Sequence, residues 1–150
     1  MVKEKIIVID DEQEILENCR RILQHHGYDC ITISKSEEAA DRVSMEKPDL
    51  VLTDLKMPGK DGLEVLRAIK ASNSKVPVVL FTAYATLETA VSAIKEGAFD
   101  YLAKPFNADQ LLAVIDKAMR EKRLVEENQR LKQELGLAFG FDKLVGTSPQ

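Results

Sequence analysis

Residues 5–12, KIIVIDDE, contain the start of a strand and the first sign of a site. Residues 6–9 are all apolar, which is typical of a strand buried on both faces. The strand runs directly into Asp10 and Asp11. Adjacent carboxylates repel each other, and placing them at the end of a buried strand costs free energy unless a positive charge lies beside them. We therefore expect a cation or a cationic side chain at this strand end.

The composition is that of an ordinary globular protein. A chain of 150 residues, 45% hydrophobic and 31% charged, favours one domain with at most an appendage. Its net charge of -4 disfavours direct nucleic-acid binding by this segment. No apolar run approaches the roughly 18 residues of a membrane span, and no signal peptide is indicated. Cys19 and Cys30 lack metal-ligand spacing, so we expect reduced thiols in a cytoplasmic protein.

Five short apolar segments alternate with five helical patterns. The predicted strands are residues 5–9, 28–33, 50–53, 76–81 and 99–103. Helices are expected over residues 12–26 and 37–46, the second capped by Ser34 or Ser36, then after the MPGKDG loop, from Thr86 to Gly97, and from Asn107 onward. This alternation predicts an α/β fold, a flavodoxin-like doubly wound five-stranded parallel sheet.

Polar side chains follow four of the five predicted strands. Ligands of such sheets bind outside the carboxyl ends of the strands. The residues found there are Asp10 and Asp11, Asp54, Thr82 and Lys104. The second strand contributes nothing notable, which suits an edge position. Three acids, one hydroxyl and one lysine are thus expected to converge.

That set of groups fits a divalent metal ion and a phosphoryl group. Carboxylates about 5 Å apart repel by roughly 3 kcal/mol per pair at an effective dielectric near 20, a cost that a hard cation removes. All-oxygen ligation favours Mg²⁺. A lysine and a hydroxyl suit phosphoryl oxygens, and an aspartate beside them can attack phosphorus.

Four short motifs follow one another across residues 4–120: VIDDE, TDLKMPGKDG, FTAYA and YLAKPF. Their order and spacing resemble those of the receiver domains of two-component response regulators. The resemblance implies that a sensor histidine kinase phosphorylates Asp54, and that a Lys104–Pro105 cis peptide is present. It also implies that Mg²⁺ is bound by Asp11, Asp54 and the backbone carbonyl of Lys56, with Asp10 acting through water. Thr82 and Lys104 would contact the phosphoryl oxygens. Tyr101 would be the aromatic residue of the conformational switch.

The last helix is expected to extend beyond the receiver, residues 1–120, as a linker over residues 121–136. Leu124, Asn128, Leu131 and Leu135 follow the 4-3-4 spacing of a two-stranded coiled coil, with Asn128 fixing the register. The alternative is a solvated helical linker with chance leucines. A coiled coil would clamp two copies into a homodimer along this helix.

Residues 137–150, LAFGFDKLVGTSPQ, are predicted not to be helical. They resemble the entry to the AAA+ ATPase domain of sigma-54-dependent activators of the NtrC type. We therefore expect a regulatory fragment that lacks the rest of the AAA+ domain and neither hydrolyses ATP nor reads DNA.

Each site residue taken alone has a plainer explanation. Asp10 and Asp11 suit a helix N-terminus, and Asp54 suits an Asx-turn before Pro58. The alternative function is a Mg²⁺-dependent phosphohydrolase with an aspartyl nucleophile, but such enzymes generally place a second acid at the position of Lys56. A flavin site lacks its Ser/Thr-rich phosphate loop. The expected chemistry is therefore self-phosphorylation and its slow loss to water, without turnover of external substrates.

Overall fold

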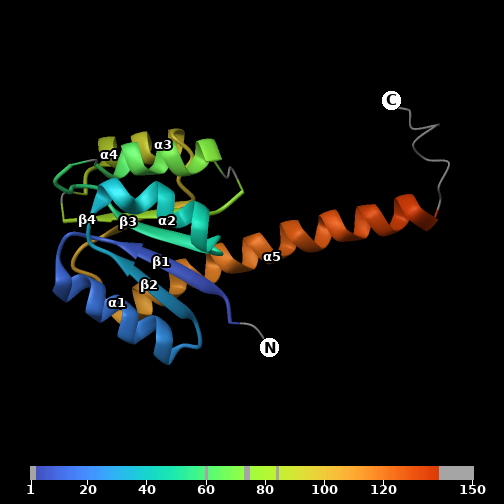
Figure 1. Ribbon diagram of the computed structural model, residues 1–150, viewed down its shortest axis with the longest axis horizontal. Helices are drawn as coiled ribbons and strands as arrows, with labels where there is room; N and C mark the ends of the chain where they lie inside the picture. Colours follow the sequence, from blue (N-terminus) through green and yellow to red (C-terminus); the bar gives the residue numbers. More distant parts are fainter. Residues whose placement is uncertain (1–2, 60, 73–74, 84, 139–150) are drawn as a thin grey trace. The chain divides into compact units, whose positions relative to one another are not determined.

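The computed structural model describes residues 3–59, 61–72, 75–83 and 85–138 (Figure 1). The chain divides into two compact units, residues 1–118 and 119–150. The first unit contains a single five-stranded sheet with its helices, as predicted. None of the helices in the described part of the chain combines the length and apolar character of a membrane span.

All strand pairs are parallel, and the sheet order is β2-β1-β3-β4-β5. This order confirms the doubly wound topology and the edge position of the second strand. In β1, which lies between β2 and β3, Ile7 pairs with Ile31 on one side and Val51 on the other. The strands are β1 (Lys5–Ile9), β2 (Asp29–Ile33), β3 (Leu50–Asp54), β4 (Val78–Thr82) and β5 (Asp100–Ala103).

The helices follow the strands in the expected alternation. Helices α2, α3 and α4 cover one face of the sheet, and α1 lies on the other (Figure 1). Their bounds are α1 (Gln13–His25), the 3-10 turn η1 (Ser36–Glu38), α2 (Ala39–Glu46), α3 (Gly62–Ser72), α4 (Leu87–Lys95) and α5 (Ala108–Ala138).

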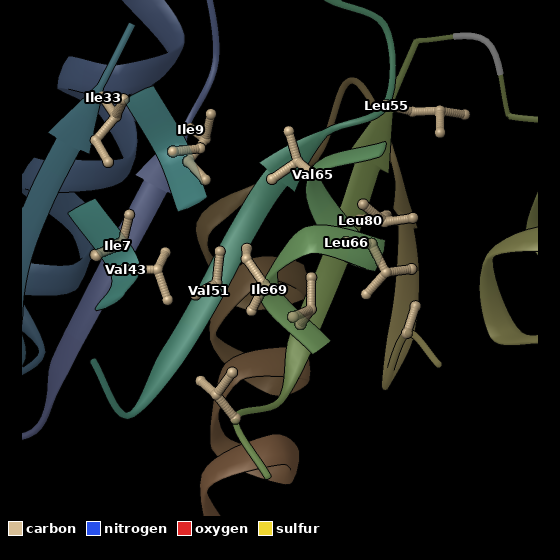
Figure 2. Close-up of a cluster of buried hydrophobic side chains, with 14 of the residues drawn as sticks. Ile7, Ile9, Ile33, Val43, Val51, Leu55, Val65, Leu66, Ile69 and Leu80 are labelled. Atoms are coloured by element: carbon tan, nitrogen blue, oxygen red, sulfur yellow. The ribbon is translucent and has the colours of Figure 1, made fainter. Parts of the chain in front are cut away.

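The continuous apolar strands bury both faces of the sheet. In β1, β3 and β4 every residue except Lys5 is buried. Ile7 and Ile9 enter the core under α2 and α3 (Figure 2). Because side chains alternate along a strand, the equally buried Ile6 and Val8 point to the opposite face. Because both faces of the sheet are buried, both sets of side chains are apolar. The sequence therefore shows continuous apolar runs and not an alternation of apolar and polar residues.

Two predicted helix caps are present and one is wrong. Thr86 accepts from the Thr89 N–H at 3.1 Å, and Asn107 accepts from the Gln110 N–H at 2.8 Å. Neither η1 nor α2 has a side-chain cap. Ser36 instead donates its hydroxyl to the Pro58 carbonyl oxygen at 2.9 Å, because Ser36 begins the 3-10 turn that precedes α2 and so lies away from the start of that helix.

Helix α5 is continuous through residue 138. The helix was expected to end at residue 136 and ends two residues later. Gly136 does not stop it, because one glycine costs a helix only about 1 kcal/mol. Three predicted seam residues, Leu124, Leu131 and Leu135, are exposed in the single chain. The predicted AAA+ entry falls mainly on residues 139–150, which lie outside the described residues.

Candidate metal centre

Three carboxylates meet where β1 and β3 end. Asp10, Asp11 and Asp54 each offer an oxygen, and these three atoms lie within 4.8 Å of one another. Adjacent parallel strands bring their carboxyl ends to the same sheet edge, so the two strands deliver the acids together. Asp10 and Asp54 are buried, whereas Asp11 is exposed. The cluster therefore has a dry side and a side open to solvent.

Lys104, which follows β5, supplies the positive group expected beside these acids. Its Nζ lies 2.8 Å from Asp10 Oδ2 and 3.4 Å from Asp54 Oδ2. The lysine side chain is only 9% exposed, and its Nζ lies 4.9 Å from the centroid of the Phe81 ring. One cation thus serves two buried carboxylates without cancelling their combined charge.

Burial dominates the protonation of this cluster. Loss of hydration raises the pKa of Asp10 to about 6, although the Lys104 hydrogen bond opposes the rise. Loss of hydration likewise raises the pKa of Asp54, against the charge of Lys104. Burial on its own lowers the pKa of Lys104, but the bond to Asp10 and the charges of Asp10 and Asp54 outweigh it, and the pKa is raised. The folded chain therefore places two buried carboxyl groups, Asp10 and Asp54, next to a single lysine amine.

This donor set fits Mg²⁺. Hard oxygen atoms suit it, and it usually binds through one or two carboxylates while keeping several waters, which the exposed side at Asp11 permits. Lys56, the predicted carbonyl ligand, lies in the loop directly after β3. Its N–H donates to Asp54 Oδ1 at a long 3.4 Å. The ligand role of its carbonyl stays a prediction.

Thr82 and Tyr101 lie at the neighbouring strands. Thr82 ends β4, is fully buried, and its backbone carbonyl accepts from the Lys104 N–H at 2.8 Å. Tyr101 in β5 is half-buried, and its hydroxyl lies 2.7 Å from Thr89 Oγ1. The Lys104–Pro105 peptide is cis, as the resemblance implied. The two phosphoryl-contact candidates therefore share a backbone hydrogen bond, and the switch candidate is tied to α4.

Three contacts at or near the site were not predicted. Glu12 Oε1 lies 3.5 Å from Lys104 Nζ, Thr89 contacts Tyr101, and Ser36 holds the loop after β3. Glu12 belongs to the acidic run after β1 and was within reach of sequence reasoning. The two hydroxyl residues carry no pattern that distinguishes them from solvent-facing or capping residues.

Comparison with known proteins agrees with this geometry. The family model described as "response regulator receiver domain" matches residues 6–116. The DNA-binding transcriptional regulator NtrC of Klebsiella pneumoniae is 40% identical over 112 residues, which is 75% of this chain and 24% of that protein. The nitrogen assimilation regulatory protein NtrX of Azorhizobium caulinodans is 38% identical over 130 residues, 85% of this chain and 29% of that protein.

Solved structures show the same fold. A response regulator receiver domain protein from Clostridium thermocellum has a TM-score of 0.77 at 39% identity, covering 81% of this chain and 98% of that one. NtrX from Brucella abortus in complex with ADP has a TM-score of 0.81 at 35% identity, covering 87% of this chain and 30% of that one. The chain spans 24% to 29% of the length of the curated relatives described above. It belongs to the response regulator receiver domain family and is similar to the receivers of NtrC- and NtrX-type regulators.

Proposed function

We propose that this chain accepts a phosphoryl group on Asp54 from a phosphohistidine of a sensor histidine kinase. An Asp54 carboxylate oxygen attacks phosphorus, an O–P bond forms, the P–N bond breaks, and its electron pair leaves with the imidazole nitrogen. The observation that carries this proposal is the meeting of three carboxylate oxygens within 4.8 Å beside the Lys104 amine.

Other residues around Asp54 bind the metal ion and contact the phosphoryl oxygens. Asp11, Asp54 and the Lys56 carbonyl would hold Mg²⁺, with Asp10 acting through water. When bound, the ion offsets negative charge on the transferring phosphoryl oxygens. Lys104, now engaged with Asp10 and Asp54, contacts a phosphoryl oxygen after transfer. The Thr82 hydroxyl contacts another.

The same residues connect the phosphoryl group to the rest of the receiver. Movement of Thr82 toward the phosphoryl group opens space for Tyr101 to turn inward, with a coupling free energy of about 1–3 kcal/mol. That turn breaks the hydrogen bond between Tyr101 and Thr89 and so alters the start of α4. The surface that changes comprises α4, β5 and α5.

Phosphorylation from acetyl phosphate tests the acceptor directly. Intact-mass spectrometry of the wild type with Mg²⁺ should show one added phosphoryl group, and Asp54→Asn should show none. Asp29→Asn, the same chemical change at an exposed residue of edge strand β2, should behave as wild type. Uptake by Asp54→Asn equal to that of the wild type would refute the assignment.

The switch has its own test. Beryllofluoride with Mg²⁺, which mimics the phosphoryl group, should shift amide signals around Thr82 and Tyr101 in the wild type and not in Asp54→Asn. Unchanged signals in the wild type would contradict the proposed movement.

We further propose that the receiver acts as an NtrC-type module, pairs through α5, and controls an attached sigma-54-dependent AAA+ activator. The exposed leucines of α5 and the similarity to NtrC and NtrX support this. Light scattering with and without beryllofluoride tests the pairing. A dimer in both states points to relief of repression, a dimer only with beryllofluoride points to activation by assembly, and a monomer in both states contradicts pairing.

A Mg²⁺-dependent phosphohydrolase could use the same carboxylates. Its second acid is replaced here by Lys56, whose amine cannot serve as a carboxylic acid. We therefore expect no multiple-turnover hydrolysis of p-nitrophenyl phosphate with Mg²⁺. Sustained turnover that Asp54→Asn abolishes would favour the enzyme instead.

A further inference from the structure

Ser36, which lies outside the acidic cluster, contacts the loop that leaves it. The residue is 2% exposed, and its hydroxyl donates to the Pro58 carbonyl oxygen at 2.9 Å. The two residues are 22 positions apart in the chain. This part-buried side-chain hydrogen bond to a main-chain carbonyl restrains that stretch of backbone.

Gly59, in the loop after β3, also lies close to η1. Gly59 has a φ of +85°, which favours glycine. A Cβ added to Gly59 would lie 2.6 Å from Glu37 Oε2 and 3.1 Å from Ser36 Oγ. The start of η1 therefore lies close to the loop, and the positive φ at Gly59 strains any other residue placed there.

The loop is also fixed where it leaves and rejoins regular structure. The Leu55 N–H donates to the Phe81 carbonyl at 2.9 Å, and the Gly62 N–H donates to the Leu55 carbonyl at 2.8 Å. Lys56, whose carbonyl is the predicted metal ligand, lies between the Leu55 anchor and the Ser36 contact at Pro58. The loop position of that carbonyl thus depends on restraints on both of its sides.

We propose that Ser36 is a positioning residue for the metal centre: by holding Pro58 it fixes the loop that presents the Lys56 carbonyl to Mg²⁺. The proposal rests on the metal ligation put forward under the proposed function. Ser36, which was predicted as a helix cap, would thus contribute to the affinity of the site for Mg²⁺. Groups that orient metal ligands typically change affinity by 10- to 100-fold when removed.

Ser36→Ala tests the proposal through metal binding itself. Titration of the isotope-labelled chain with Mg²⁺, followed by the amide signals of Lys56 and Met57, should give a dissociation constant about tenfold weaker than wild type. Phosphorylation by acetyl phosphate should slow at low Mg²⁺ and recover largely at saturating Mg²⁺. The recovery distinguishes weakened binding from damage to the acceptor.

Ser72→Ala is the matched control. Ser72 also donates its hydroxyl to a main-chain carbonyl, that of Ile69 at 3.1 Å, but at the end of α3. It should bind Mg²⁺ as tightly as wild type. Gly59→Ala, which strains the same loop because Gly59 has a φ of +85°, should weaken Mg²⁺ binding as Ser36→Ala does. It provides the comparison if Ser36→Ala unfolds at the titration temperature.

The outcomes separate this inference from the proposed function. If the wild type binds no Mg²⁺ and takes up no phosphoryl group, the proposed function fails. If the wild type does both while folded Ser36→Ala or Gly59→Ala binds Mg²⁺ as tightly as wild type, the positioning role is wrong and the function stands. An equal loss in Ser72→Ala would also overturn the positioning role.

Discussion

Asp10 ionises in the folded chain at a free-energy cost. Its side chain is fully buried, and its pKa is raised from 3.8 to about 6 chiefly by loss of hydration. Between these values the folded state binds more protons than the unfolded state. The free energy of unfolding therefore falls as the pH rises from about 4 to about 6. Replacing the carboxylate with a neutral amide should remove this cost.

The size of the effect follows from the pKa. One pKa unit corresponds to about 1.4 kcal/mol, so ionised Asp10 lowers the free energy of unfolding by about 3 kcal/mol at pH 7. As the pH falls through 3.8, the carboxyl group becomes protonated in the unfolded state as well, and the cost falls toward zero. We expect Asp10→Asn to stabilise the metal-free chain by about 2–3 kcal/mol at pH 7 and by less than about 0.5 kcal/mol below pH 4.

Urea unfolding followed by circular dichroism, with EDTA present, measures this difference across pH 3.5 to 7. Asp29→Asn, the same change at an exposed residue, should alter the free energy of unfolding by no more than about 0.5 kcal/mol. Mg²⁺ should stabilise the wild type more than Asp10→Asn, because the ion offsets the charge of the buried Asp10 carboxylate, which the amide lacks. If Asp10→Asn is no more stable than wild type at pH 7, or gains equally below pH 4, the burial argument is wrong.

Three further outcomes are expected. Lys47 ends α2 at a φ of +50°, so Lys47→Gly should raise the free energy of unfolding by about 0.5–1 kcal/mol in urea; a loss would contradict the strain. Burial raises the pKa of Cys19 to about 12 and of Cys30 to about 11, so iodoacetamide at pH 8 should label the folded chain far more slowly than the unfolded one; equal rates would contradict this. Asn107→Ala removes the cap of α5 and should cost about 1 kcal/mol by thermal unfolding, whereas Asn107→Asp should cost less.

The sheet and the gathering of acids were predictable because one physical rule governs both. Parallel strands buried on two faces produce runs such as that in β1, and their carboxyl ends share one edge. Asp10, Asp54 and Lys104 could therefore be placed together from their positions after such runs. Their contacts in the structure agree with that expectation.

The remaining features depend on tertiary contacts that no local pattern encodes. Ser36 lies where a helix cap is expected, but a 3-10 turn redirects its hydroxyl toward Pro58. Thr89 meets Tyr101 only because α4 packs beside β5. The sharing of Lys104 between two acids, with Glu12 nearby, likewise arises from packing, because sequence spacing does not set side-chain distances.

Gly62, the first residue of α3, touches no reacting group, yet a methyl group there would lie 2.4 Å from the backbone oxygen of Asp54. A mutational survey would therefore score this position as intolerant alongside the acceptor itself. Its sensitivity would reflect crowding of the main chain that carries the acceptor rather than any part in the chemistry. Surveys of such sites are best read with a measure of backbone clearance beside each score.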